Sequence, residues 1–354
     1  MSRFFSEKYS NLTPYTPGEQ PQDKKYIKLN TNESPFPPSP LAQKMACEEA
    51  GSLQLYSDPE VKLLVKDAAA CFGIAEDEII FTNGSDDALN FACMAFCDET
   101  HPLVFPDVTY GFYSVFAELN HVPYEEIPVK DDFSINVSDY AGIGRNIFIA
   151  NPNAQTGIAL PLSDIEKIVS SNPDNVVLVD EAYVDFGGES AIGLIRKYSN
   201  LIVTGTLSKS RSLAGARIGF AIADRALIND MNTIRYSTNP YNINRMTMQA
   251  ARGALADTEY FKANCEKIKE VRAYTVSELE KLGFTVTDSK ANFILAKSDK
   301  IGGKEFYLTL KEKGILVRHF ETARLKEYNR ITIGSREQME TFIRVTAEII
   351  GERE

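Results

Sequence analysis

The residues best suited to chemistry in this chain surround one lysine. Lys209 follows Thr206 and Ser208 in a hydroxyl-rich loop, Arg217 lies eight positions further on, and Asp180 ends an earlier apolar segment. Pyridoxal phosphate requires an amine for its aldehyde, anion-binding groups for its phosphate and a carboxylate for its ring nitrogen. These residue types and their spacing therefore predict a site for this cofactor.

Each of these residues also has an ordinary interpretation. Lys209 could be a solvated surface residue, Asp180 could cap a turn, and Arg217 could form a salt bridge across a sheet. However, a carboxylate that ends an apolar strand is costly to bury unless it meets a cation. A desolvated lysine near other cations loses its proton more readily, as attack on an aldehyde requires. The combination favours the cofactor interpretation.

A second anion-binding element comes earlier, where Gly84, Ser85 and Asp86 begin a predicted helix. The free N–H groups and the dipole of a helix N-terminus favour a phosphate, although a simple helix cap uses the same residue types. Open α/β sheets bind ligands at the carboxyl ends of their strands. This element, Asp180 and the Lys209 loop all follow predicted strands, so we expect them to converge at one edge of a sheet.

The elements that position these residues belong to an α/β fold. Short apolar runs near 78–82, 102–105, 146–150, 176–180 and 201–204 alternate with amphipathic helical segments. Runs that are apolar on both faces are typical of buried parallel strands. We therefore predict a large domain over residues 41–260 with a mainly parallel sheet. Residues 1–40 are predicted to form an N-terminal arm, and residues 261–354 a smaller C-terminal α+β domain.

The composition excludes several other classes of function. The net charge of −11 disfavours a broad nucleic-acid or anionic-membrane surface, and no apolar segment is long enough to span a bilayer. Five cysteines without a paired pattern suit a reducing cytoplasm, and three scattered histidines suggest no metal site. A nicotinamide enzyme is disfavoured because no Gly-x-Gly-x-x-Gly motif follows an early strand. We expect a soluble cytoplasmic protein.

From about residue 12 to residue 335 the chain resembles the fold-type I pyridoxal-phosphate aminotransferases, and among these the histidinol-phosphate aminotransferases. The segments that carry the resemblance are Asp180-Glu-Ala-Tyr183, Ser208-Lys209 and Asn329-Arg330-Ile-Thr-Ile-Gly334. The resemblance implies that Lys209 holds the cofactor and acts as general base and acid, and that Asp180 contacts its ring nitrogen. It also implies that Tyr183 lies beside the phenolic oxygen of the cofactor and that Arg330 binds the substrate carboxylate.

Three further segments resemble parts of the same family. Thr109-Tyr110 matches the segment whose tyrosine stacks on the cofactor ring, and Leu55-Tyr56-Ser-Asp-Pro59 matches the one that reaches the cofactor phosphate of a neighbouring subunit. The resemblance therefore implies a homodimer with shared active sites. The arm segments around Tyr15 and Asn32 match the family's arm and imply a role for both residues in substrate binding.

One segment departs from the family pattern. Where the family has Asn-Pro-Asn-Asn-Pro, this chain has Asn151-Pro-Asn153-Ala154-Gln155. The asparagine that would bind the phenolic oxygen aligns with Ala154. Either Asn153 substitutes from one position earlier or Tyr183 holds that oxygen alone.

The reaction implied by the resemblance is transfer of an amino group from histidinol phosphate to 2-oxoglutarate, a step of histidine biosynthesis. An aromatic amino acid aminotransferase and a threonine-phosphate decarboxylase are alternatives, because both would use the same lysine. A cofactor-bearing regulatory protein without turnover is disfavoured, since Lys209, Asp180 and Arg217 are all present.

Overall fold

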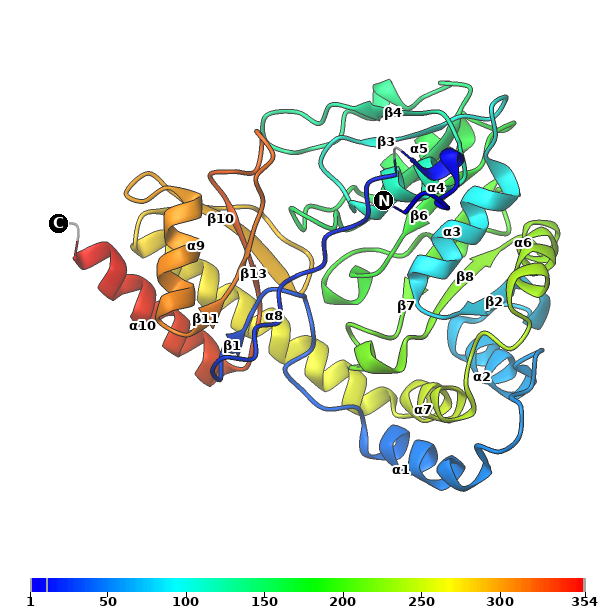
Figure 1. Cartoon of the computed structure of the whole chain (residues 1–354), viewed down its shortest axis with the longest axis horizontal. Coiled ribbons are helices and arrows are strands. Elements are labelled where there is room, and N and C mark those ends of the chain that lie inside the picture. The colour runs from blue at the N-terminus through cyan, green and yellow to red at the C-terminus, as the bar shows by residue number, and fades with distance from the viewer. Residues whose placement is uncertain (1, 11, 353–354) are drawn as a thin grey trace.

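The computed structural model describes residues 2–10 and 12–352. Asn11, the first residue of the arm segment that ends at Tyr15, therefore lies outside the described residues. The chain forms a large unit around one sheet, a small unit around another, and an extended arm that crosses between them (Figure 1). The helix α8 (Thr258–Lys281) carries the chain from the large unit into the small one (Figure 1). A sharp division at residue 260 therefore stays a prediction.

The large unit is built on a seven-stranded sheet with the order β2-β8-β7-β6-β5-β3-β4. Its neighbouring strands pair in parallel except β8, which is antiparallel to both β2 and β7. The α/β fold class is thus confirmed. The strands of this sheet are β2 (Ile79–Thr82), β3 (Leu103–Pro106), β4 (Tyr124–Ile127), β5 (Asn146–Ala150), β6 (Val177–Asp180), β7 (Leu201–Thr206) and β8 (Gly219–Ala223).

Helices cover both faces of this sheet, which is why its central strands β5 and β6 are buried at every position and mainly apolar. In β6, for example, Val177 and Val179 pack into one buried cluster, whereas Leu178 packs into another on the opposite face. The helices of the large unit are α1 (Pro40–Glu49), α2 (Lys62–Phe72), α3 (Ser85–Phe96), α4 (Phe112–Leu119), α5 (Leu162–Ser170), α6 (Arg225–Thr238) and α7 (Arg245–Ala256). Short 3₁₀ helices lie at η1 (Glu7–Tyr9), η2 (Ala50–Ser52), η3 (Glu76–Glu78), η4 (Val137–Asp139), η5 (Val184–Phe186), η6 (Ala191–Leu194) and η7 (Ala214–Ala216).

The small unit contains a four-stranded antiparallel sheet with the order β12-β13-β10-β9. Ser335 and Gln338 form a capping box that starts its last helix. Its elements are β9 (Phe284–Val286), β10 (Phe293–Ser298), α9 (Gly303–Glu312), β11 (Ile315–Leu316), β12 (Arg318–His319), β13 (Asn329–Thr332) and α10 (Arg336–Gly351).

The arm is attached mainly to the small unit. Its strand β1 (Ile27–Lys28) pairs in parallel with β11, and the guanidinium of Arg318 donates to the carbonyls of Thr16 (3.0 Å) and Pro17 (3.2 Å). In Figure 1 the arm, in dark blue, passes from the large unit to β11. The arm therefore lies along the junction of the two units.

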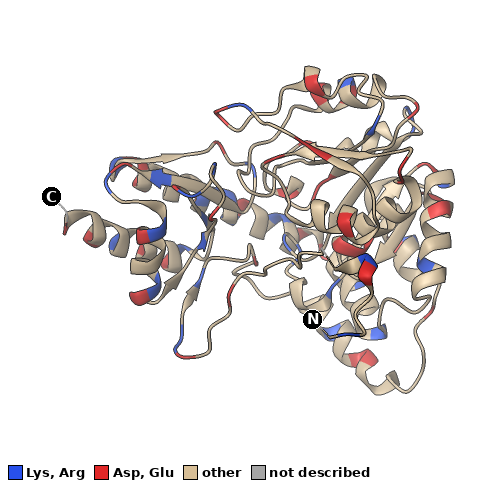
Figure 2. Ribbon diagram, turned by 45° about the horizontal axis from the view of Figure 1, so that its top comes forward, with Lys and Arg blue, Asp and Glu red and all other residues tan. Residues whose placement is uncertain are grey.

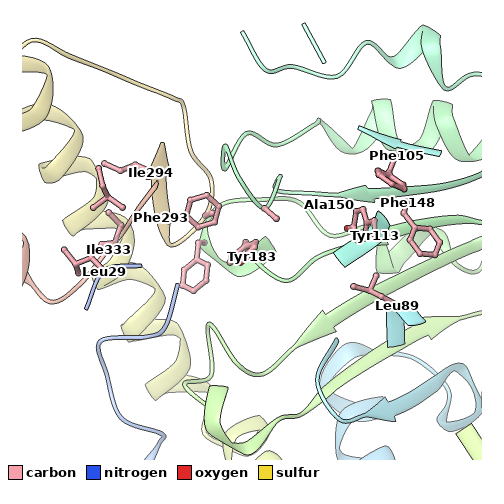
Figure 3. Packing of buried hydrophobic residues seen from close by; sticks show 14 of the residues in the cluster. Leu29, Leu89, Phe105, Tyr113, Phe148, Ala150, Tyr183, Phe293, Ile294 and Ile333 are labelled. Carbon is pink, nitrogen blue, oxygen red and sulfur yellow. The ribbon is translucent and has the colours of Figure 1, made fainter. Parts of the chain in front are cut away.

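A continuous buried cluster joins the two units behind this junction (Figure 3). Tyr183 packs edge-to-face against Phe293 of β10, with ring centroids 5.0 Å apart and an interplanar angle of 85°. Figure 3 shows Tyr183 between this small-unit residue and Ala150 and Phe148 of the large sheet. The relative position of the two units is thus fixed by packed side chains.

Charged residues of both signs are interspersed over both units (Figure 2). Among the described residues, no helix combines the length and the apolar character needed to cross a membrane.

Candidate active site

A pocket of about 230 Å³ lies at the carboxyl ends of β6 and β7, where the large unit, the small unit and the arm meet. It brings together most of the residues predicted to form the site. Those that line it are Tyr15, Asn32, Ser85, Asp86, Tyr110, Asp180, Tyr183, Thr206, Ser208, Lys209, Arg217 and Arg330.

Lys209 lies in the turn after β7 and points into this pocket with a partly buried side chain. Its Nζ donates to the Thr31 carbonyl at 3.3 Å and lies 6.0 Å from the ring centroid of Tyr183. Burial, together with the nearby charge of Arg330, lowers the pKa of Lys209 to about 8. The fraction of the amine that is neutral near physiological pH, and therefore able to attack an aldehyde, is much larger than for an ordinary lysine.

Asp180 ends β6 and is buried at the base of the pocket. Its carboxylate accepts hydrogen bonds from the hydroxyls of Tyr113 (3.2 Å) and Thr204 (3.2 Å). Burial nevertheless raises the pKa of Asp180 to about 6, because the two hydroxyls compensate only part of the lost hydration. A protonated ring nitrogen would restore the balance of charge. Tyr113 was not predicted; its position one turn after Tyr110 on an apolar helix face was the available signal.

The start of α3 forms one wall of the pocket, and two glycines shape it. Gly84 has a φ of 85° and precedes the first helical residue, Ser85. Gly219 of β8 lies directly beneath, and a Cβ at Gly219 would overlap the backbone nitrogen of Ser85. The strand can approach the helix N-terminus this closely only because it carries glycine there. Gly219 was not predicted from the sequence, since a single glycine in a strand has no pattern of its own.

Arg217 stands beside this helix N-terminus in a left-handed conformation, with a φ of 53°. Its Nη2 pairs with Asp86 at 2.9 Å, and the Tyr110 hydroxyl donates to the other oxygen of the same carboxylate at 2.8 Å. Thr206 donates to Ser208 across the same wall at 2.8 Å. A guanidinium, two hydroxyls and a helix N-terminus together fit a dianionic phosphate.

Tyr183 is connected to the arm through Asn32. The Asn32 side-chain amide donates to the Tyr183 hydroxyl at 3.0 Å and accepts from the Thr332 hydroxyl at 3.1 Å. Since the tyrosine oxygen acts as acceptor in this bond, its own hydrogen can be donated into the pocket. Burial raises the pKa of Tyr183, so the hydroxyl keeps that hydrogen at neutral pH.

The opposite end of the pocket holds two arginines. Arg330 of β13 donates to the Ala154 carbonyl at 2.8 Å and to the Gln155 side chain at 3.2 Å, and its buried Nε has no hydrogen-bond partner among the described residues. Arg318 of β12, which the sequence analysis did not select, lies directly opposite Arg330 in the sheet register and also lines the pocket. Like charges placed opposite each other on neighbouring strands are destabilising. This end of the pocket therefore favours the binding of an anion.

Comparison with known proteins agrees with this chemistry. Residues 24–345 match the family model described as aminotransferase class I and II. The chain belongs to this family. The aminotransferase is 47% identical over 352 residues to histidinol-phosphate aminotransferase of Brachyspira hyodysenteriae, with 99% of each chain covered. It is 48% identical over 343 residues to that of a Marinomonas species, with 96% of this chain and 97% of the relative covered.

A solved structure shares the fold of the aminotransferase. Histidinol-phosphate aminotransferase of Sinorhizobium meliloti, in complex with pyridoxal-5'-phosphate, superposes with a TM-score of 0.85 at 23% identity. The match covers 93% of this chain and 92% of that one. The enzyme is thus a pyridoxal-phosphate-dependent aminotransferase, and the residues of its pocket fit the cofactor. Lys209 suits the aldehyde, Asp180 the ring nitrogen, and the wall formed by Ser85 and Arg217 the phosphate.

The expectation that Asn153 binds the cofactor is not met by the geometry of the aminotransferase. The Asn153 amide donates to the Val108 carbonyl at 2.7 Å, and its oxygen accepts from the backbone nitrogens of Gln155 (2.9 Å) and Thr156 (3.1 Å). The side chain is therefore used to stabilise a turn, as asparagine often does. Ala154 contributes only a methyl group beside the pocket, which leaves Tyr183 as the candidate partner of the phenolic oxygen.

Tyr56 also lies away from the pocket of its own chain. Its side chain is 80% exposed and stacks on Tyr241, with ring centroids 4.7 Å apart. This position leaves it available to another chain, so its contact with the cofactor phosphate of a neighbouring subunit stays a prediction.

Proposed function

We propose that this aminotransferase transfers the amino group of histidinol phosphate to 2-oxoglutarate, as a step of histidine biosynthesis. The observation that carries the proposal is the pair formed by Arg318 and Arg330 at the substrate end of the pocket. The full-length relatives at 47% and 48% identity support the same assignment.

The two arginines explain how one site serves two substrates. A guanidinium fork binds either a carboxylate or a phosphate through paired hydrogen bonds. Arg330 would hold the α-carboxylate of glutamate or 2-oxoglutarate in one half-reaction and the phosphate of histidinol phosphate in the other. Arg318, opposite it in the sheet, adds the second positive charge that a phosphate dianion requires. Tyr15 of the arm lines the same end of the pocket.

Pyridoxal phosphate, when bound, supplies an aldehyde that accepts the amino group and a ring that accepts electrons. Lys209 would take the proton from the substrate Cα and deliver it to the carbon that forms the aldehyde of the cofactor, and a pKa of about 8 suits an amine for both tasks. Asp180 would hold the proton at the ring nitrogen, and Tyr183 would donate to the phenolic oxygen. Ser85, Thr206, Ser208 and Arg217 would bind the phosphate, while Tyr110 would cover the face of the ring.

We further propose a homodimer in which each active site is completed by the partner chain. Exposed apolar side chains gather in the segment after α1, where Leu53 is 55% exposed, Leu55 57% and Tyr56 80%. Neighbouring exposed apolar side chains of this kind are typical of protein–protein contacts. The cysteines Cys47, Cys71, Cys93, Cys97 and Cys265 are all free thiols, which supports a cytoplasmic location.

The proposal is tested by the first half-reaction on cofactor-loaded enzyme without any keto acid. Histidinol phosphate, phenylalanine and phosphothreonine would each be mixed with the enzyme, and the loss of absorbance of the pyridoxal form recorded. We expect histidinol phosphate to react at least about a hundredfold faster in kcat/KM than phenylalanine, because only its phosphate satisfies both arginines. Lys209→Ala should show no conversion.

Two outcomes would contradict this assignment. A preference for phenylalanine would move the enzyme to the aromatic aminotransferases. Release of carbon dioxide from phosphothreonine would identify a decarboxylase instead.

A further inference from the structure

Two surface loops of the large unit present a pair of stacked tyrosines. Tyr56 lies in the loop that precedes α2, and Tyr241 lies in the loop that connects α6 and α7. Their rings are 4.7 Å apart with an interplanar angle of 24°, and they remain 80% and 44% exposed. Two large side chains are thus held in a defined arrangement while pointing outward.

A buried arginine connects the backbones of these two loops. Arg235 of α6 is only 4% exposed, and its Nη1 donates to the carbonyls of Pro59 (2.7 Å) and Pro240 (3.5 Å). Its Nε donates to the Asn232 side chain at 3.0 Å, and the guanidinium lies over the Tyr236 ring. All of these acceptors are uncharged. Burying a cation whose partners are carbonyl and amide oxygens costs free energy. This cost indicates that the two loops have a function that depends on their being held in place.

A second arginine holds the other end of the first loop. Arg245, at the start of α7, donates from Nη1 to the Tyr56 carbonyl at 3.1 Å and pairs with Glu49 of α1 at 2.5 Å. Within the loop, Asp58 accepts from the backbone nitrogens of Glu60 and Lys62. The carbonyls of Tyr56 and Pro59 and the backbone nitrogens of Glu60 and Lys62 are therefore all hydrogen-bonded.

The backbone of this loop is strained as well as tied. Val61 has a φ of 52° and a ψ of 30°, a left-handed conformation that β-branched residues rarely adopt. Such strain persists only where the surrounding contacts impose it, and it is typical of functional sites. A loop serving only as a connection would not require Val61 in this conformation.

We propose that Arg235 and Arg245 are positioning residues for the active site of the partner subunit. By holding the Pro59 and Tyr56 carbonyls, they fix the direction in which Tyr56 leaves its own chain to meet the cofactor phosphate bound by the partner. The inference rests on the proposed function, in which Tyr56 completes the neighbouring site. Because the loop is ordered in advance, little conformational entropy is lost when the cofactor binds.

The first test measures cofactor affinity in Arg235→Gln, whose shorter amide cannot contact both loops. We expect pyridoxal phosphate to bind about tenfold more weakly, as titrated by absorbance, with partial recovery in Arg235→Lys. Arg252→Gln is the matched control, because Arg252 of α7 pairs with Asp67 of α2 and donates to Gln249 of its own helix, whereas Arg235 and Arg245 hold the loop carbonyls. Thermal denaturation would establish that each variant folds.

The second test separates an effect on the partner's site from damage to the variant's own chain. Mixed dimers of a Lys209→Ala chain and an Arg235→Gln chain would be isolated with two affinity tags. One site then combines both lesions, whereas the other has an intact lysine and an intact loop. We expect about half the wild-type activity at limiting cofactor, since one of two symmetric sites is whole.

The outcomes separate failure of the positioning role of Arg235 from failure of the shared active site. Mixed dimers of Lys209→Ala with Tyr56→Phe test only whether the active site is shared. If they fail to recover activity, both the shared active site and the positioning role of Arg235 are wrong. If those dimers recover activity but the Arg235→Gln mixture does not, Arg235 acts on its own chain and only the positioning role is wrong. Unchanged cofactor affinity in Arg235→Gln would also overturn it.

Discussion

At the scale of single residues, the active site depends on moving two charged groups towards neutrality. Burial lowers the pKa of Lys209 to about 8 and raises the pKa of Asp180 to about 6. In both cases the low-dielectric surroundings disfavour the charged form. Burial of these two charged groups therefore costs stability in the cofactor-free protein, and a ligand of complementary charge would offset that cost.

This balance predicts a pH-dependent stability effect in cofactor-free protein. Below pH 8 the Lys209 amine is mostly protonated in both the folded and the unfolded state, and burial of the charged amine disfavours the folded state. As the pH rises from about 8 towards 10.5 the folded state sheds the proton first, so the penalty disappears. Lys209→Met should then raise the free energy of unfolding at pH 7 by roughly 2 kcal/mol, allowing for partial exposure.

Urea denaturation at pH 7 and pH 10 measures the effect directly. The gain from Lys209→Met should shrink at the higher pH, whereas Lys44→Met, at a mostly exposed position on α1, should give no such trend. A gain that is equal at both pH values would show that the charge of Lys209 is not responsible.

The sequence could predict those site residues whose chemistry is unusual for their location. Lys209 among hydroxyls and Asp180 at the end of an apolar run are of this kind, and the structure brings both into one pocket. Arg318 could not be found this way, because its role depends on its position opposite Arg330 in the sheet, which the sequence does not reveal. Asn153 has suitable chemistry for a ligand contact, but its oxygen is used by its local turn and its amide donates to the Val108 carbonyl.

At the scale of elements, the phosphate wall depends on how closely β8 approaches the start of α3. Substituting Gly219→Ala would place a methyl group against the Ser85 backbone nitrogen, and neither backbone can move without disturbing the sheet. We expect a loss of about 2 kcal/mol in stability and a larger loss of cofactor affinity. Calorimetry and absorbance titration would measure the two effects.

Gly215→Ala provides the control for this prediction. Gly215 lies four residues earlier in η7, and a Cβ there would meet open space. If both variants bind the cofactor equally well, the close approach of β8 to α3 has no role in the phosphate site.

Element prediction from the sequence succeeded for several strands that are buried on both faces, although β8, which is also buried at every position, was not predicted. The runs that became β5, β6 and β7 are mainly apolar, and they were recognised. β4 was not selected, because as an edge strand it reads Tyr-Glu-Glu-Ile and exposes its first three residues. The pairing of β1 with β11 was also not foreseen, since two-residue strands carry no periodicity.

At the scale of the whole molecule, the proposed dimer predicts that one apolar segment controls assembly. Leu55→Glu would place a carboxylate within the exposed patch after α1 and should weaken self-association at least about tenfold. Sedimentation velocity and activity at matched dilution would measure the change, and activity should fall together with the dimer. Leu308→Glu on α9 is the control, because Leu308 is comparably exposed, at 46%, but lies in the small unit.

If Leu55→Glu lost activity without dissociating, the apolar segment after α1 would not control assembly of the dimer. Equal dissociation in Leu308→Glu would place the contact surface elsewhere.

The pairing of β1 with β11 also constrains how the protein is made. Ile27 leaves the ribosome early, yet its partner in the sheet is Ile315. At ordinary rates of translation, on the order of tens of seconds separate the synthesis of these two residues. The arm must therefore remain unattached while the large unit forms. The site that depends on Asn32 can be completed only when the last part of the chain has emerged.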